Sequence, residues 1–108
     1  MRDMERQVVE MQITCGSEAE ATTIADALVE RRLAACVQAL PIRSTYRWQG
    51  AIERDDELLL LVKTVAARID DVCATVHELH SYDVPALTVV EVAGGSDDYL
   101  DWVRTETS

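Results

Sequence analysis

The sequence is poor in basic residues. Its 108 residues include 10 Lys and Arg against 20 Asp and Glu, which gives a formal net charge of -10 at pH 7. A field of this sign repels phosphate backbones. The composition therefore argues against nucleic acid as a partner and against a polybasic membrane anchor.

Long apolar runs are lacking as well. No stretch approaches the ~18 consecutive apolar residues that a membrane span needs. The first residues, MRDMERQ, are charged and do not resemble the apolar core of a secretory signal. The three cysteines, Cys15, Cys36 and Cys73, are an odd number and lie far apart, which is not a disulfide framework. We therefore expect reduced thiols, no membrane insertion and a cytoplasmic location.

Linkers, repeats and familiar catalytic motifs are also missing. With 4 Gly, 2 Pro and 48% hydrophobic residues, the composition is that of a globular chain. The sequence contains no GxSxG elbow, GxGxxG loop, P-loop or HExxH motif. We predict a single domain over residues 8–108, preceded by a disordered N-terminal tail over residues 1–7, and a protein that is not an enzyme.

Three segments have the pattern of β-strands. Residues 8–15 alternate between apolar and polar side chains, which indicates a half-buried strand. Residues 36–48 and 51–63 are rich in strand-forming residues, and Gln49-Gly50 between them suits a hairpin turn. The run LLLLV in the return strand is typical of a central strand covered on both faces. At ~3.3 Å per residue this ribbon is longer than a small sheet requires, so its excess should protrude or pair with another chain.

Helical patterns separate the strands. Ser17 opens a capping box (S-x-x-E), which predicts a helix that extends to about residue 33. A second helix is predicted from a Thr64 cap to about His80, because apolar residues form one stripe along it. A fourth strand over residues 86–93 and an acidic terminal helix over residues 96–106 complete the chain.

The order of these elements predicts the fold. Strand, helix, strand, strand, helix, strand is the split βαβ pattern of an α+β ferredoxin-like sandwich, with four antiparallel strands, a long extended hairpin and a C-terminal helix. Pro41 confines its strand to an edge or a bulge, because it cannot donate to the ladder. Two helices cover one face of such a sheet, so we infer that the chain oligomerises through the open face or the ribbon.

Cys15 is the first candidate for chemistry. It ends a strand directly before a glycine and a helix N-terminus, a position that lowers the pKa of a thiol. The alternative is a small core residue, because Cys15 shares its face with Met11 and Ile13.

A second candidate group lies on the second predicted helix. Cys73, His77 and His80 are spaced by four and three residues, which puts their ligand atoms on neighbouring turns, where a soft metal ion could use them. The alternative is packing at the margin of the apolar stripe. His80 also ends the helix, where the dipole would favour its protonated form or the ring would cap the last carbonyls.

The ribbon carries acidic and aromatic side chains. The acidic side chains are Glu53, Asp55, Asp56 and Glu57. They either form a solvated edge that discourages aggregation between sheets or provide a weak binding site for a hard cation. Tyr46 and Trp48 share one face of the ribbon, which indicates an interface rather than a platform for stacking bases. Cys36 opens an apolar strand, and we interpret it as structural.

Four segments together resemble the CutA family of divalent-cation tolerance proteins. They are ALVERRLAACVQALP at 27–41, STYRWQGAIERDDELLLLVKT at 44–64, ELHSYDVPAL at 78–87 and YLDWV at 99–103. The resemblance implies a single CutA-like domain assembled as a tight homotrimer, in which ribbons pair between subunits. It further implies that four aromatic side chains are interface or core residues: Tyr46, Trp48, Tyr99 and Trp102.

The resemblance also implies a role in metal-ion tolerance. A cysteine at the end of the first strand matches Cys15, and a histidine before the Tyr-x-x-Pro segment matches His80. Some members have a second histidine where this chain has Leu79. We therefore expect a non-enzymatic homotrimer that binds copper, as Cu(I) or Cu(II), or another divalent cation through Cys15 and His80. Cys73 and His77 are reserve ligands.

A different function class is a PII-like trimeric regulatory or interaction scaffold, which would bind a small molecule or a partner protein between subunits. This hypothesis rests on fold-level analogy. An anionic effector would need basic groups, and those on the ribbon are Arg43, Arg47, Arg54 and Lys63.

Overall fold

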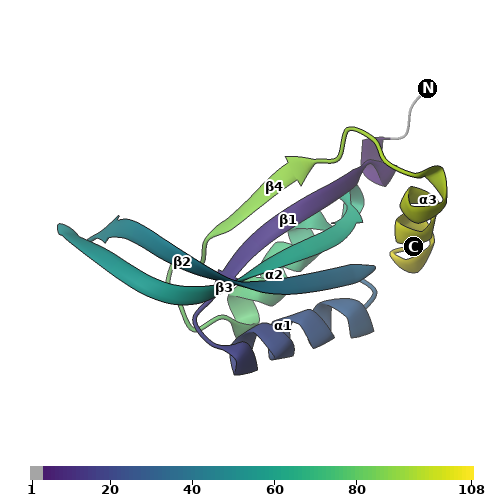
Figure 1. The fold of residues 1–108 in the computed structure, drawn as a ribbon. Coiled ribbons are helices and arrows are strands. Elements are labelled where there is room, and N and C mark those ends of the chain that lie inside the picture. The colour runs from purple at the N-terminus through teal and green to yellow at the C-terminus, as the bar shows by residue number, and fades with distance from the viewer. Residues whose placement is uncertain (1–3) are drawn as a thin grey trace.

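A computed structural model describes residues 4–108 (Figure 1). The elements follow one another as η1 (Met4–Arg6), β1 (Val8–Cys15), α1 (Glu18–Glu30), β2 (Cys36–Trp48), β3 (Ala51–Val65), η2 (Ala66–Arg68), α2 (Ile69–Leu79), β4 (Leu87–Glu91) and α3 (Asp97–Glu106). The strands form one antiparallel sheet in the order β2-β3-β1-β4. The predicted α+β ferredoxin-like topology is therefore confirmed.

The main core lies between the sheet and the two helices α1 and α2, which cover one of its faces (Figure 1). Met11 and Ile13 of β1 pair with Val62 and Leu60 of β3, and all four are fully buried. Each such side chain contributes ~1.5–3 kcal/mol through burial. The next residue of β3, Leu61, has the opposite parity and is only half-buried. β3 is thus a central strand as predicted, but within one chain its second face has little cover.

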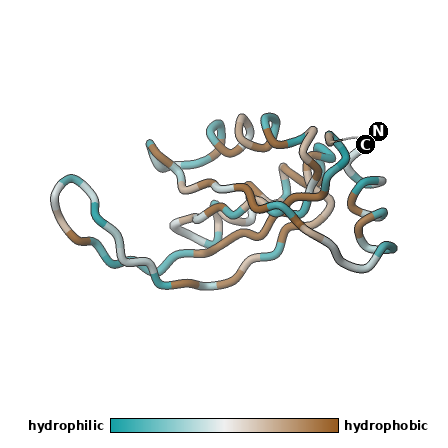
Figure 2. The backbone as a smooth tube through the Cα atoms, turned by 90° about the horizontal axis from the view of Figure 1, so that it is seen from above, coloured by the Kyte–Doolittle hydropathy of each residue, from teal (hydrophilic) through white to brown (hydrophobic). Residues whose placement is uncertain are grey.

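The hairpin of β2 and β3 reaches well beyond the helix layer, as Figure 2 shows from above. Its turn residues Gln49 and Gly50 have φ angles of 48° and 84°. Left-handed conformations at both central positions are those of a type I′ turn, which matches the twist of a hairpin. β2 is an edge strand, as Pro41 predicts. Trp48 and Ile52 near the tip are exposed.

The helix boundaries differ from the predicted ones. α1 ends at Glu30, three residues early, because the chain turns through Arg32 at a φ of 59°. Thr64 is not a helix cap: it lies in β3, and its buried hydroxyl donates to the Leu33 carbonyl at 2.6 Å. The ladder between β1 and β3 continues to the end of β3, so strand pairing overrides the local capping preference. α2 therefore begins only at Ile69, after η2.

The far end of the sheet is closed by α3. Val103 of α3 is fully buried and packs against Val8 and Val65 in a second, smaller core cluster. β4 is shorter than the predicted strand over 86–93. Among the described residues, no helix combines the length and apolarity that a membrane span requires.

The predicted disordered tail covers residues 1–7, of which residues 1–3 lie outside the described part of the chain. Met4–Arg6 form η1. The side-chain amide of Gln7 donates to the Val92 carbonyl at 2.9 Å. The described part of this segment is therefore attached to the sheet.

Candidate metal centre and neighbouring cavity

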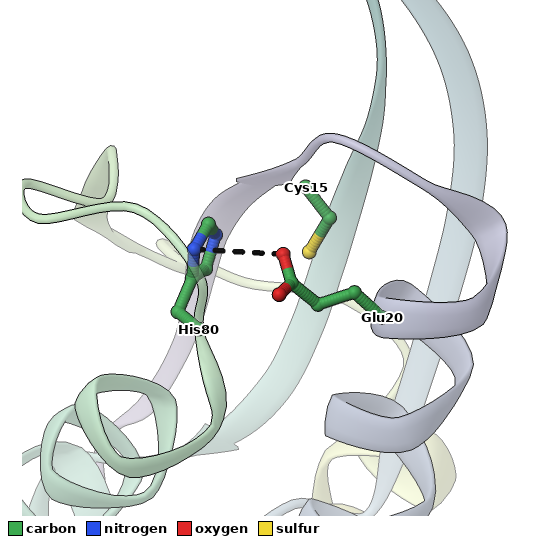
Figure 3. A group of neighbouring side chains, drawn as sticks. All are labelled: Cys15, Glu20 and His80. Atoms are coloured by element: carbon green, nitrogen blue, oxygen red, sulfur yellow. Dashed lines mark ion pairs between the residues drawn. The ribbon is translucent and has the colours of Figure 1, made fainter.

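Three side chains with metal-binding chemistry converge where β1 ends, α1 begins and α2 ends (Figure 3). Cys15 is the last residue of β1, Glu20 lies in the first turn of α1, and His80 is the C-cap of α2. Their ligand atoms all lie within 4.8 Å of one another. The packing of α1 and α2 on β1 thus unites residues that are distant in the sequence.

The Cys15 thiol is held in the core. Cys15 is 0% exposed. Burial, followed by the charges of Glu20 and Glu57, raises the pKa of its thiol to about 11. The expectation of a lowered pKa at a helix N-terminus is wrong, because loss of hydration and two carboxylates outweigh the helix dipole. The alternative prediction from strand parity, a core residue, is confirmed.

Glu20 has a different role from the one that the capping box predicts. The Ser17 hydroxyl accepts a hydrogen bond from the Glu20 amide at 3.2 Å, so the cap itself is confirmed. The Glu20 carboxylate does not return to Ser17. It accepts from the Ser81 amide at 2.8 Å and from the Ser81 hydroxyl at 3.2 Å. Glu20 therefore ties α1 to the loop after α2, a role for which the sequence holds no signal beyond its acidic type.

Both ring nitrogens of His80 have backbone partners. Nε2 lies 2.7 Å from the Thr14 carbonyl oxygen, and the Tyr82 amide donates to Nδ1 at 3.1 Å. A carbonyl only accepts and an amide N–H only donates, so in this arrangement Nε2 is assigned as the donor and Nδ1 as the acceptor. Glu20 Oε2 lies 3.6 Å from Nδ1, a contact that becomes an ion pair only if a proton displaces the Tyr82 amide. The ring therefore bonds to β1 and to the loop after α2, and does not cap the last carbonyls of α2.

The three donors fit a divalent cation in kind. A thiolate, a carboxylate and an imidazole form a mixed set that suits Cu(II) or Zn(II). Ligands at ~2.0–2.3 Å from a tetrahedral ion lie ~3.5 Å apart, so the group would have to contract slightly. Each donor would also give something up: the Cys15 thiol its proton, His80 Nδ1 its bond from Tyr82, and the Glu20 carboxylate a bond from Ser81. Binding would therefore be coupled to proton release.

The reserve ligands do not join this group within residues 4–108. His77 Nδ1 lies 2.8 Å from the Cys73 carbonyl oxygen, one helical turn back. Cys73 packs against the core, and burial, followed by the charge of Asp70, raises the pKa of its thiol. Helical spacing brings these residues onto neighbouring turns, but their side chains do not converge on His80.

A cavity of about 590 Å³ opens at the base of the hairpin and extends along it as far as Trp48. Its walls include Tyr46, Trp48 and Tyr82, together with the carboxylates of Glu57 and Asp83. The Tyr82 ring links the cavity to the candidate metal centre, because its centroid lies 4.7 Å from that of His80.

Glu57 departs from the interpretation of the acidic residues as a solvated edge. It is 9% exposed and accepts a hydrogen bond from the Tyr82 hydroxyl at 2.9 Å. Glu53, Asp55 and Asp56 are exposed, as that interpretation predicts. Sequence reasoning could not single out Glu57, because the loop that buries it follows α2.

Comparisons with known proteins identify relatives of the whole domain. Residues 9–106 match the family described as CutA1 divalent ion tolerance protein. The divalent-cation tolerance protein CutA of Thermus thermophilus is 50% identical over 96 residues, which are 88% of this chain and 93% of that protein. The protein CutA of Homo sapiens is 42% identical over 96 residues, 88% of this chain and 54% of the human protein. The chain therefore spans about half the length of this human relative.

Solved structures give the same result. A structure from Archaeoglobus fulgidus, described as a periplasmic divalent cation tolerance protein CutA, has a TM-score of 0.92 at 35% identity, covering 94% of this chain and 99% of that one. The structure from Thermus thermophilus has a TM-score of 0.91 at 47% identity, with coverages of 94% and 99%. The resemblance inferred from the four sequence segments is confirmed.

Proposed function

Since this chain belongs to the CutA1 divalent ion tolerance family, we propose that it acts in metal-ion tolerance as a non-enzymatic homotrimer that binds a divalent metal ion, copper foremost. Cys15 Sγ, His80 Nδ1 and the Glu20 carboxylate would hold the ion. The observation that carries this proposal is the convergence of these three donor types within 4.8 Å.

Metal binding at this group should depend strongly on pH. Because burial raises the pKa of the Cys15 thiol to about 11, the ion must displace a proton at neutral pH. The affinity should then rise about tenfold per pH unit below that pKa. His80 Nδ1 accepts a hydrogen bond from the Tyr82 amide, so the ion would have to take the place of this donor.

A calorimetric titration of the reduced protein with Cu(I) and with Cu(II) tests the site. We expect saturable binding near one ion per subunit or per trimer. The double variant Cys15→Ser/His80→Ala should abolish it. The matched control Cys73→Ser/His77→Ala changes the same residue types outside the group and should retain it. Weak, non-saturating uptake that salt suppresses would mean that only the acidic surface responds, and would refute the site.

The homotrimer is supported by the surface of the single chain. Four aromatic side chains, expected at the interface from the resemblance, are between 39% and 46% exposed: Tyr46, Trp48, Tyr99 and Trp102. The half-buried Leu59 and Leu61 lie on the sheet face that α1 and α2 leave uncovered. Light scattering should give three times the chain mass of 12.0 kDa. A monomer at micromolar concentration would refute this assembly.

The cavity at the base of the hairpin favours a second candidate function, a PII-like regulatory or interaction scaffold that binds a small molecule or a partner protein between subunits. Among residues 4–108, no Lys or Arg lines this cavity, whereas Glu57 and Asp83 do. An anionic effector, which the arginines of the ribbon would bind, therefore does not fit this cavity. A thermal-shift screen that includes both charge classes tests this function, because a ligand bound only by the native state raises the melting temperature.

We also propose a cytoplasmic location. The support for it is that Cys15, Cys36 and Cys73 are free thiols, which suit a reducing compartment. The Archaeoglobus fulgidus relative is described as periplasmic, so kinship alone does not decide the matter. Fractionation of cells that express the chain should recover it with cytosolic markers, and recovery with another compartment would refute the proposal.

A further inference from the structure

Glu57 is a buried carboxylate with no cation of its own. It is 9% exposed and lines the cavity at the base of the hairpin. Its hydrogen bond comes from the neutral hydroxyl of Tyr82, and none of the ion pairs between residues 4 and 108 involves it. Burying a charge without a counter-charge is costly. The cavity that Glu57 lines gives a counter-ion a route to this carboxylate.

The aromatic walls of the cavity also suit a cation. Tyr46, Trp48 and Tyr82 line it, and the electron-rich faces of aromatic rings attract ammonium and guanidinium groups. Both tyrosine hydroxyls donate to carboxylates, Tyr82 to Glu57 and Tyr46 to Asp55. Donation to a carboxylate fixes each ring and increases its electron density, so the two rings are better cation acceptors than free phenols.

The remaining lining selects by charge and by shape. Asp83 adds a second acidic residue, and no Lys or Arg of the described part of the chain lines the cavity, which disfavours phosphates and carboxylates as ligands. Val84 and Ala86 add apolar surface. A ligand that matches all of these features has N–H donors for Glu57 and a short apolar body.

We propose that this cavity binds a small organic cation, a primary amine or a guanidinium compound, with its cationic group at Glu57 and its apolar body among Tyr46, Trp48 and Tyr82. The inference deepens the scaffold function proposed above by naming its ligand class, and it does not depend on the metal centre. Because Tyr46 and Trp48 also belong to the proposed trimer surface, the ligand would be held at a subunit boundary. A Lys or Arg side chain of a second copy has the same chemistry, so the test separates the two sources.

The test uses 2-phenylethylamine, an ammonium ion at neutral pH, and its neutral analogue 2-phenylethanol. Both are titrated calorimetrically into the full chain at about 0.15 M salt, where long-range attraction to the acidic surface is screened. We expect saturable binding of the amine and at least about tenfold weaker binding of the alcohol, the difference of a charge-assisted hydrogen bond.

Two variants locate the binding. Glu57→Gln keeps an acceptor for Tyr82 but removes the charge, and it should weaken amine binding by about tenfold or more. Asp56→Asn removes one charge from the neighbouring exposed position, outside the cavity lining. This control should change the affinity by less than about twofold, because an exposed charge is screened.

Equal binding of amine and alcohol would overturn the proposal, as would full amine affinity in Glu57→Gln. If the amine does not bind and Glu57→Gln lowers the oligomeric mass, a second copy supplies the cation and the free-ligand proposal is refuted. Light scattering on the same samples tests the trimer separately from amine binding. A monomer that binds the amine would refute the trimer but not the amine site. Amine binding should persist in Cys15→Ser, which removes the thiolate from the metal centre and leaves His80 against Tyr82.

Discussion

The buried thiol of Cys15 should make the protein lose stability in alkali. Burial and the neighbouring Glu20 and Glu57 raise the pKa of this thiol from the ordinary 9.0 to about 11. The folded state therefore holds the thiol proton more tightly than the unfolded state does. A group of this kind contributes stability that is complete below pH 9 and is lost as the pH rises from 9 to 11, because unfolding then releases the proton.

The magnitude follows from the two pKa values. A shift of about 2 pKa units corresponds to about 2.7 kcal/mol when the thiol is fully ionised in both states. At pH 10 the unfolded chain has lost most of its thiol proton and the folded chain little, so about 1.4 kcal/mol of this contribution should be gone. Cys15 is 0% exposed, so solvent screening does not reduce this value.

Urea denaturation at a series of pH values between 8 and 10.5 measures this effect, with protein concentration held constant because an oligomer's apparent stability depends on it. Cys15→Ala provides the reference, since it retains every tyrosine and lysine that titrates in the same range. The free energy of unfolding should fall by about 1.4 kcal/mol more in the wild type than in Cys15→Ala between pH 8 and 10. Parallel pH profiles would refute the reasoning that Cys15 is buried beside two carboxylates.

Three further substitutions probe the fold and the cavity. Thr64→Val leaves the Leu33 carbonyl without its partner and should lower the free energy of unfolding by about 1–3 kcal/mol; a neutral effect in urea denaturation would contradict the buried bond. A Cβ at Gly16 would lie 2.7 Å from the Tyr82 hydroxyl oxygen, so Gly16→Ala should displace that hydroxyl and cost about 1 kcal/mol of stability; calorimetry should also show weaker amine binding. Leu60→Ala empties a fully buried site and should cost about 2–5 kcal/mol in urea denaturation, and a loss below that range would place Leu60 outside the core.

The sequence predicts correctly those structural features that involve only residues a few positions apart. The turn at Gln49-Gly50 needs two left-handed residues. A glycine at the second position, between two strand-forming runs, is a local signal for it. The cap at Ser17 likewise involves a side chain and an amide three residues apart. Alternation along residues 8–15 determined which side chains face the helices, because a strand has only two faces.

Other features depend on contacts between residues that are far apart in the sequence. Thr64 has the local chemistry of a helix cap, but the ladder with β1 draws it into β3 and gives its hydroxyl another partner. Glu20 makes only the backbone half of the capping box, through its amide, because its carboxylate accepts hydrogen bonds from Ser81 instead. Neither outcome can be derived from the residues nearby.

The chemistry of the candidate sites depends entirely on contacts between residues that are distant in the sequence. Cys15 and His80 could be paired from the sequence only through a family resemblance, and the raised pKa of the Cys15 thiol depends on desolvation and on two carboxylates brought from elsewhere in the chain. Glu57 differs from its acidic neighbours on the hairpin only because Tyr82 and its loop fold over it. The amino-acid sequence by itself determined the order of the elements, the turn and the core stripe, since these depend on residues a few positions apart. Only the tertiary structure decided how far the site residues are removed from water, which charges surround them and which metal-binding donors converge. Each of these depends on which distant segments pack together.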